Sequence, residues 1–95
     1  MNTKNDIISE CLFCGTKNIH RENLDDKIWL YQCHGCAPYE ASNMIMARIN
    51  GKIGSIGNPI ASEIKREILD KIITVYQKTG SPLKLDSPDI EILID

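Results

Sequence analysis

Residues 18–32 contain two short segments whose side chains are typical of β-strands. Residues 18–24 predict a first strand, and residues 27–32, which are rich in large side chains, predict a second. Asp25 and Asp26 separate the two segments and predict the turn. Residues 1–9 are mostly polar and predict an N-terminal tail. The first folded element is therefore expected to be a β-hairpin.

Two helices are predicted after the hairpin. Residues 40–50 place four apolar side chains on one helical face and are followed by Gly51, a common helix terminator. Residues 58–80 begin with an asparagine and a proline and end with Gly80, which are typical start and stop signals. The apolar stripe of the second helix is formed by Ile60, Ile64, Ile68, Ile72, Val75 and Tyr76. Because this stripe is larger than a short hairpin can cover, we expect part of it to contact a partner or a second copy of the chain.

The segments on either side of the second helix predict less regular structure. Residues 51–57 contain three glycines in seven positions and are interpreted as a flexible connector, because they lack the lysine and serine that end a phosphate-binding loop. Residues 81–95 alternate apolar and acidic positions and contain Pro82 and Pro88, so they predict an acidic extended tail that forms an edge strand. That strand would complete the chain's own sheet or pair with a partner.

Chain length and charge limit the functional classes. A chain of 95 residues permits one domain, and its net charge of −2 differs from the basic character of typical nucleic-acid-binding domains. Residues 80–95 contribute one basic and four acidic side chains, which would repel phosphate. Nucleic-acid binding is therefore not favoured. The alternative is a basic patch around the hairpin, formed by Lys17, Arg21, Lys27, Arg48 and Lys52.

The cysteines have the spacing of a metal site. They form two pairs with two residues inside each pair and eighteen residues between the pairs. A C-x2-C pair lets two thiolates of one turn reach the same ion, and two such pairs complete the tetrahedral sulfur shell of a structural zinc. The sequence therefore predicts one structural Zn²⁺ per chain, with the ligands Cys11, Cys14, Cys33 and Cys36.

Other uses of the cysteines fit the sequence less well. Two disulfides require an oxidising compartment, whereas residues 1–6 lack the apolar stretch of a signal peptide, so reduced thiols and a cytoplasmic location are expected. A redox site would normally have a single C-x2-C pair. A catalytic zinc keeps one coordination position open, which four thiolates would fill, so an enzyme is not expected. No apolar run is long enough to predict a membrane span.

The predicted fold is a small α+β domain: a zinc ribbon, meaning a β-hairpin with two zinc knuckles, followed by two helices and a C-terminal edge strand. Gly15 can supply the positive φ angle that the first knuckle needs, whereas the second knuckle has Ala37 at the equivalent position and is expected to be irregular. Trp29 and Tyr31 lie on one face of the second strand. They either stack a nucleobase or, as we favour, pack in the core.

Residues 10–50 also resemble a known family. The Cys-Leu-Phe-Cys-Gly motif at 11–15, the Cys-His-Gly-Cys pair at 33–36 and a helix that ends in Ala-Arg-Ile-Asn at residues 47–50 are similar to the small zinc ribbons of the restriction-alleviation (Lar-type) group of phages and prophages. Leu12 and Ile49 depart from that group, which has proline and tryptophan there. The zinc-binding part of MqsA-type antitoxins has a similar cysteine pattern. Both resemblances imply zinc at the four cysteines and a small regulatory or anti-defence role.

These observations predict a non-enzymatic zinc-binding protein that acts as a protein-interaction or regulatory module. The expected contact surface for a protein partner is the helix of residues 60–76 or the acidic tail, and the same helix is a candidate homodimer interface. The alternative is a zinc-ribbon regulator that binds nucleic acid through Lys17, Arg21, Lys27 and Trp29.

Overall fold

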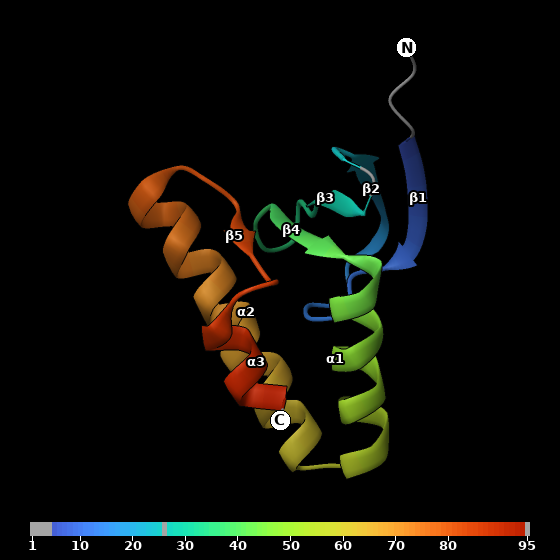
Figure 1. The fold of residues 1–95 in the computed structure, drawn as a ribbon, viewed down its shortest axis with the longest axis vertical. Coiled ribbons are helices and arrows are strands. Elements are labelled where there is room, and N and C mark those ends of the chain that lie inside the picture. The colour runs from blue at the N-terminus through green and yellow to red at the C-terminus, as the bar shows by residue number, and fades with distance from the viewer. Residues whose placement is uncertain (1–4, 26, 95) are drawn as a thin grey trace.

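A computed structural model describes residues 5–25 and 27–94 of the chain, which form a small α+β fold. The sheet lies at one end of the molecule, and the helices extend from one of its faces (Figure 1). In chain order the described elements are β1 (Asn5–Glu10), β2 (Lys17–Asn23), β3 (Ile28–Gln32), β4 (Tyr39–Ser42), α1 (Asn43–Ile56), α2 (Ile60–Thr79), β5 (Leu83–Lys84) and α3 (Pro88–Ile94).

The strands of the described sheet follow the order β1-β2-β3-β4-β5. Neighbouring strands from β1 to β4 are antiparallel, and β5 runs parallel to β4. The register places Arg21 opposite Asp6 on one side and Tyr31 on the other, and places Tyr31 opposite Tyr39. These side chains therefore share the face of the sheet that packs toward the helices. The predicted hairpin of residues 18–32 is confirmed as the β2–β3 pair.

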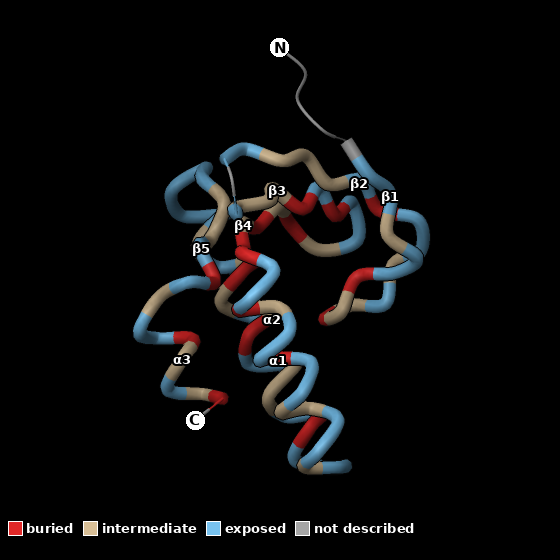
Figure 2. The backbone as a smooth tube through the Cα atoms, turned by 45° about the vertical axis from the view of Figure 1, so that its right-hand side comes forward, coloured by how far each residue is buried: buried red, intermediate tan, exposed pale blue. Residues whose placement is uncertain are grey.

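One continuous apolar core joins this sheet face to the helices. Buried residues lie in the sheet and along α1 and α2 (Figure 2). The helical part of the core is aliphatic and consists of Ile45, Ile49, Ile68, Ile72, Leu85, Ile90 and Ile94. Because the C-terminal segment supplies three of these residues, it is part of the fold and not an appendage.

The C-terminal segment is also tied to the start of α1 by hydrogen bonds. Ser42 caps α1, since its Oγ accepts a hydrogen bond from the Ile45 N–H at 3.1 Å. The Asp86 carboxylate in turn accepts hydrogen bonds from the Ser42 N–H at 2.8 Å and from the Ser42 hydroxyl at 2.6 Å. This arrangement fixes the junction between β4 and α1 from a residue far away in the sequence.

The boundaries predicted for the first helix and for the connector are wrong. Residues 39–42 form β4, so the helix begins at Asn43 and not at residue 40. It then continues to Ile56, through the segment of residues 51–57 that was expected to be a flexible connector. Ile49 and Ile53 explain the extension, because their spacing continues one helical face into the core, and Ile56 is half-buried one turn further on. Gly57, with φ of 75°, ends the helix.

The two ends of the chain also differ from expectation. Residues 5–10 form β1 and not an N-terminal tail, and residues 1–4 lie outside the described residues. In the expected extended tail of residues 81–95, the only strand within the described part is Leu83–Lys84, and Pro88–Ile94 form the helix α3. Ile90 and Ile94 are four residues apart and both buried, so helical burial outweighs the alternating pattern that suggested an edge strand. Asp95 is not among the described residues.

The helix at residues 58–80 is confirmed as α2, which spans Ile60–Thr79 and ends at Gly80 with φ of 74°. Its apolar stripe is covered in the middle and open at both ends: Ile68 and Ile72 are fully buried, whereas Ile60 is 50% and Tyr76 is 39% exposed. The middle of the stripe is therefore not available to a partner. No helix in the described residues combines the length and apolarity needed to cross a bilayer.

Candidate metal centre

The four cysteines converge at one point beside the core. Two come from the turn after β1 and two from the turn after β3, and none of the four forms a disulfide. All four Sγ atoms lie within 4.8 Å of one another, and the Sγ atoms of Cys14 and Cys33 are 3.4 Å apart. Cys11 and Cys33 are buried, and Cys14 and Cys36 are half-buried. The structure thus brings together every cysteine that the sequence singled out.

This spacing matches the requirements of a tetrahedral thiolate site. A metal–sulfur distance of about 2.3 Å places the sulfur atoms of a tetrahedron about 3.8 Å apart. Sulfur atoms that all lie within 4.8 Å of one another can reach that geometry by small side-chain rotations. The four thiols can therefore hold one metal ion, in agreement with the sequence prediction.

Backbone hydrogen bonds shape the first knuckle, at residues 11–16. The Cys11 N–H donates to the Thr16 carbonyl at 2.8 Å, and the Gly15 N–H donates to the Cys11 carbonyl at 3.0 Å. Gly15 has a φ of 78°, which confirms the positive φ expected from the sequence. The Thr16 Oγ1 lies 3.1 Å from the Cys14 Sγ. The hydroxyl can donate to that sulfur when it is a thiolate.

Close approach of the two knuckles depends on a second glycine, Gly35. A Cβ atom at this position would overlap the Thr16 hydroxyl of the first knuckle. The backbone of one knuckle therefore packs directly on a side chain of the other. Sequence reasoning assigned Gly35 no role, because the contact joins two turns that are far apart in the chain.

An aromatic stack connects the metal centre to the sheet. The Tyr39 hydroxyl lies 3.4 Å from the Cys11 Sγ, in a side chain that is fully buried. The Tyr39 ring stacks on Tyr31 with centroids 5.0 Å apart, and Phe13 of the first knuckle meets it edge-on at 5.4 Å. Sequence reasoning missed Tyr39. The available signal was an aromatic residue three positions after the second cysteine pair.

The thiols strongly affect one another's protonation. A hydrogen bond with Cys36, aided by the Tyr39 hydroxyl, lowers the pKa of the Cys11 thiol to about 4, so this thiol ionises first. The same hydrogen bond raises the pKa of Cys36, which keeps its proton beside the Cys11 thiolate. Burial raises the pKa of Cys33 and, with the nearby Cys11 charge, that of Tyr39. Crowded thiols of this kind lose their protons together when a cation binds.

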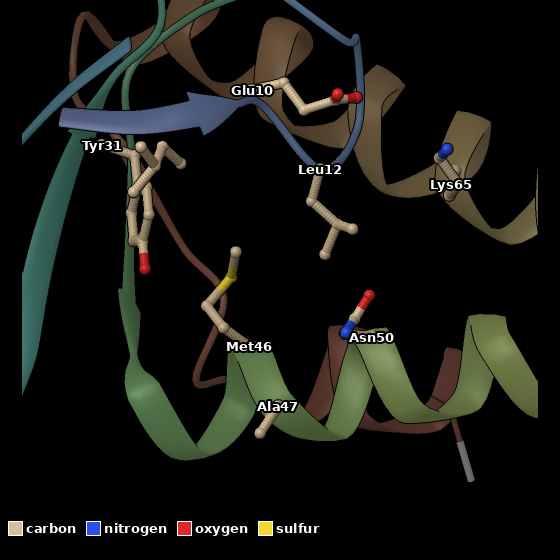
Figure 3. Close-up of a pocket in the computed structure, with 8 residues that line it drawn as sticks. Glu10, Leu12, Tyr31, Met46, Ala47, Asn50 and Lys65 are labelled. Atoms are coloured by element: carbon tan, nitrogen blue, oxygen red, sulfur yellow. The ribbon is translucent and has the colours of Figure 1, made fainter. Parts of the chain in front are cut away.

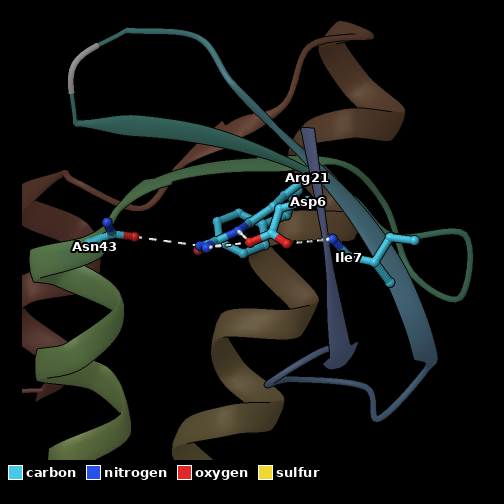
Figure 4. Close-up of polar contacts among 5 residues, drawn as sticks. Asp6, Ile7, Arg21 and Asn43 are labelled. Carbon is cyan, nitrogen blue, oxygen red and sulfur yellow. Dashed lines mark hydrogen bonds and ion pairs between the residues drawn. The ribbon is translucent and has the colours of Figure 1, made fainter. Parts of the chain in front are cut away.

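The residues proposed as a nucleic-acid surface are engaged within the protein. Arg21 stacks its guanidinium 4.1 Å above the centre of the Trp29 ring. It also binds the Asp6 carboxylate at 2.9 Å (Figure 4). Its Nη1 further donates to Tyr31 at 3.2 Å and to Asn43 at 3.5 Å. Arg21 thus covers one face of the indole that a nucleobase would need.

Other members of the basic patch are similarly occupied. Lys17 forms an ion pair with Glu10 at 2.8 Å, and Arg48 approaches Glu91 at 3.7 Å. Lys27 is exposed beyond the β2–β3 turn. Three of the five residues of the predicted basic patch, Lys17, Arg21 and Arg48, therefore have an acidic neighbour that partly neutralises them.

A scan against protein-family models, a search of curated proteins and a search of solved structures each found no match.

Proposed function

We propose that the four cysteines bind one structural Zn²⁺ and that the protein is a non-enzymatic module that binds another protein in a zinc-dependent manner. The observation that carries the proposal is the convergence of four thiols from two separate turns within 4.8 Å. Tetrahedral sites of four thiolates favour zinc or iron, and a single-ion site of two C-x2-C knuckles is typical of structural zinc. When bound, the ion would cross-link the two turns and contribute folding free energy.

The donor set supports a structural rather than a catalytic role. Four thiolates fill the tetrahedral shell, so no position would be open for water or substrate. The side chains around the sulfurs also point to a structural role. Tyr39 and Thr16 place hydroxyls against the sulfurs, where they can stabilise thiolate charge and orient the ligands.

A protein partner is favoured over a nucleic acid because the basic side chains near the hairpin already pair with acids of the chain. The resemblance of residues 10–50 to Lar-type zinc ribbons implies a biological process for this proposal, in which the module would regulate a host or phage defence protein.

Two measurements test the proposal. Metal analysis of protein purified without added metal should give about one zinc per chain, and the Cys14→Ser variant should retain much less. The zinc-loaded chain should then capture a protein partner from its native cell extract, and the chelated chain and Cys14→Ser should not. Retention on DNA or RNA at about 50 mM salt, lost steeply as salt rises, would instead support the nucleic-acid alternative.

A further inference from the structure

A cavity of 440 Å³ lies between the sheet, the first knuckle and α1, on the helix side of β1. Leu12 points from the knuckle toward α1, and Met46 and Asn50 point from α1 toward the knuckle (Figure 3). Its volume falls within the range of about 300–1,000 Å³ that is typical of ligand sites. The remaining lining residues are Ile8, Glu10, Tyr31, Ala47 and Lys65.

The cavity is lined by both apolar and polar side chains. Figure 3 shows Tyr31 and Met46 toward one end and Lys65 toward the other, with Leu12 between Glu10 and Asn50. An occupant therefore needs an apolar group to replace water beside Tyr31, Met46 and Leu12, and a polar group to bind near Asn50 and Lys65.

The charged lining residues are Glu10 and Lys65. Glu10 already forms an ion pair with Lys17, which lies outside the lining, and the hydrogen bond and charge of Lys17, together with the charge of Lys65, lower the Glu10 pKa. Within residues 5–25 and 27–94, Lys65 itself forms no ion pair. Because Lys17 neutralises Glu10, Lys65 is the lining charge that is left for a ligand. The complementary ligand group is an anion that can also accept a hydrogen bond from the Asn50 amide.

β1, which supplies Ile8 and Glu10 to the cavity lining, is an end strand of the described sheet, so its outer edge pairs with no other strand described. The Ile7 N–H on β1 donates instead to the Asp6 carboxylate at 2.9 Å. A peptide beside β1 could bind backbone groups of this edge, whereas a simple fatty carboxylate could not.

We propose that this cavity is the partner-binding site and that it takes a peptide segment in which a bulky apolar side chain adjoins an acidic residue. The apolar side chain lies among Leu12, Met46 and Tyr31, and the acidic side chain pairs with Lys65. This inference rests on the proposed function, because it assumes that the ligand belongs to a protein.

The test uses the zinc-loaded, ¹⁵N-labelled full chain titrated with the peptide acetyl-Ser-Leu-Phe-Glu-Ser-amide, to about 1 mM or above. Amide signals should shift at Ile8, Leu12, Ala47 and Asn50. The same peptide with Gln in place of Glu should bind about three- to fivefold more weakly, which is the effect of losing one solvent-accessible ion pair.

Three variants locate the binding. Ala47→Trp, at an exposed α1 position, should fill the cavity and abolish the shifts. Lys65→Gln should bind the Glu and Gln peptides equally. Lys78→Gln, on the exposed end of the same helix, is the matched control and should bind like the wild type.

Several results would overturn the assignment. These are no shift at the highest peptide concentration, shifts elsewhere on the surface, unchanged binding by Ala47→Trp, or tighter binding of decanoate than of the peptide. If the native partner is captured equally by Ala47→Trp and by the wild type, the cavity is the wrong site and the proposed function stands. If the zinc-loaded chain captures no partner, the proposed function itself fails.

Discussion

The two ends of the core are stabilised by different kinds of contact. Near the cysteines, thiols, a tyrosine hydroxyl and stacked rings meet in defined geometries, such as the 3.4 Å contact between Cys11 and Tyr39. Between α1, α2 and α3, the buried side chains are aliphatic, with Ile49, Ile68 and Ile72 fully buried. Directional contacts fail when one atom is lost, whereas aliphatic packing loses stability in proportion to the volume removed. Loss of one ligand or of the metal should therefore unfold the cysteine end completely. Substitutions at the helical end should lower the stability gradually, according to the volume removed.

Metal removal is the strongest test of this contrast. Structural zinc contributes an apparent free energy of about 10–16 kcal/mol in small peptides, which is comparable to the whole stability of a domain. Chelation, or Cys14→Ser, should therefore unfold at least residues 10–40, observed as loss of their dispersed ¹⁵N amide signals and of circular dichroism. Restoring zinc to the chelated wild type is the control and should recover both. A spectrum that the chelator leaves unchanged would contradict a structural role for the metal.

At the helical end, truncation of a buried isoleucine should lower the free energy of unfolding by a moderate and measurable amount. Ile68→Ala should lower the free energy of unfolding by about 2–5 kcal/mol, because it leaves a cavity in the aliphatic core. Ile60 is 50% exposed on the same helix, so Ile60→Ala should change it by less than about 0.5 kcal/mol. Urea unfolding of the zinc-loaded proteins measures both. A large cost at Ile60, together with stability that rises with protein concentration, would show that α2 pairs with a second copy after all.

Gly35→Ala tests how tightly the knuckles are packed. The added methyl group overlaps the Thr16 hydroxyl, so the variant should lose about 1–3 kcal/mol of stability and bind zinc more weakly. Competition with a zinc chelator measures the affinity. The double variant Gly35→Ala with Thr16→Ala removes the clashing oxygen and should recover part of the loss, since the Thr16 Cβ would still lie 3.0 Å from the added methyl group. Wild-type affinity in the single variant would mean that the two knuckles are farther apart than the structure shows.

The parts of the fold that could be predicted from sequence are those with local signals. The cysteine ligands follow from spacing within two turns, and α2 follows from a long stripe that ends at Gly80. β1 was missed because an edge strand needs few apolar residues. Tyr39 and Gly35 were missed because their partners, Cys11 and Thr16, come from a distant turn. α3 was missed because three apolar residues at alternate positions resemble a strand until the buried ones are known.

The last prediction concerns the glycines that suggested a connector. Gly51 and Gly54 lie inside α1, and a Cβ atom at either position would meet no atom within 4 Å. Gly51→Ala and Gly54→Ala should therefore each stabilise the protein by about 0.5–1 kcal/mol, since alanine restricts the unfolded chain without strain in the helix. Gly57→Ala is the matched control and should destabilise it by about 1–3 kcal/mol, because φ of 75° with ψ of 168° is a conformation almost confined to glycine. Thermal unfolding measures all three. Unchanged stability in the first two variants would contradict the prediction. It would mean that residues 51–56 are not helical in solution and that Ile53 does not pack against the aliphatic core.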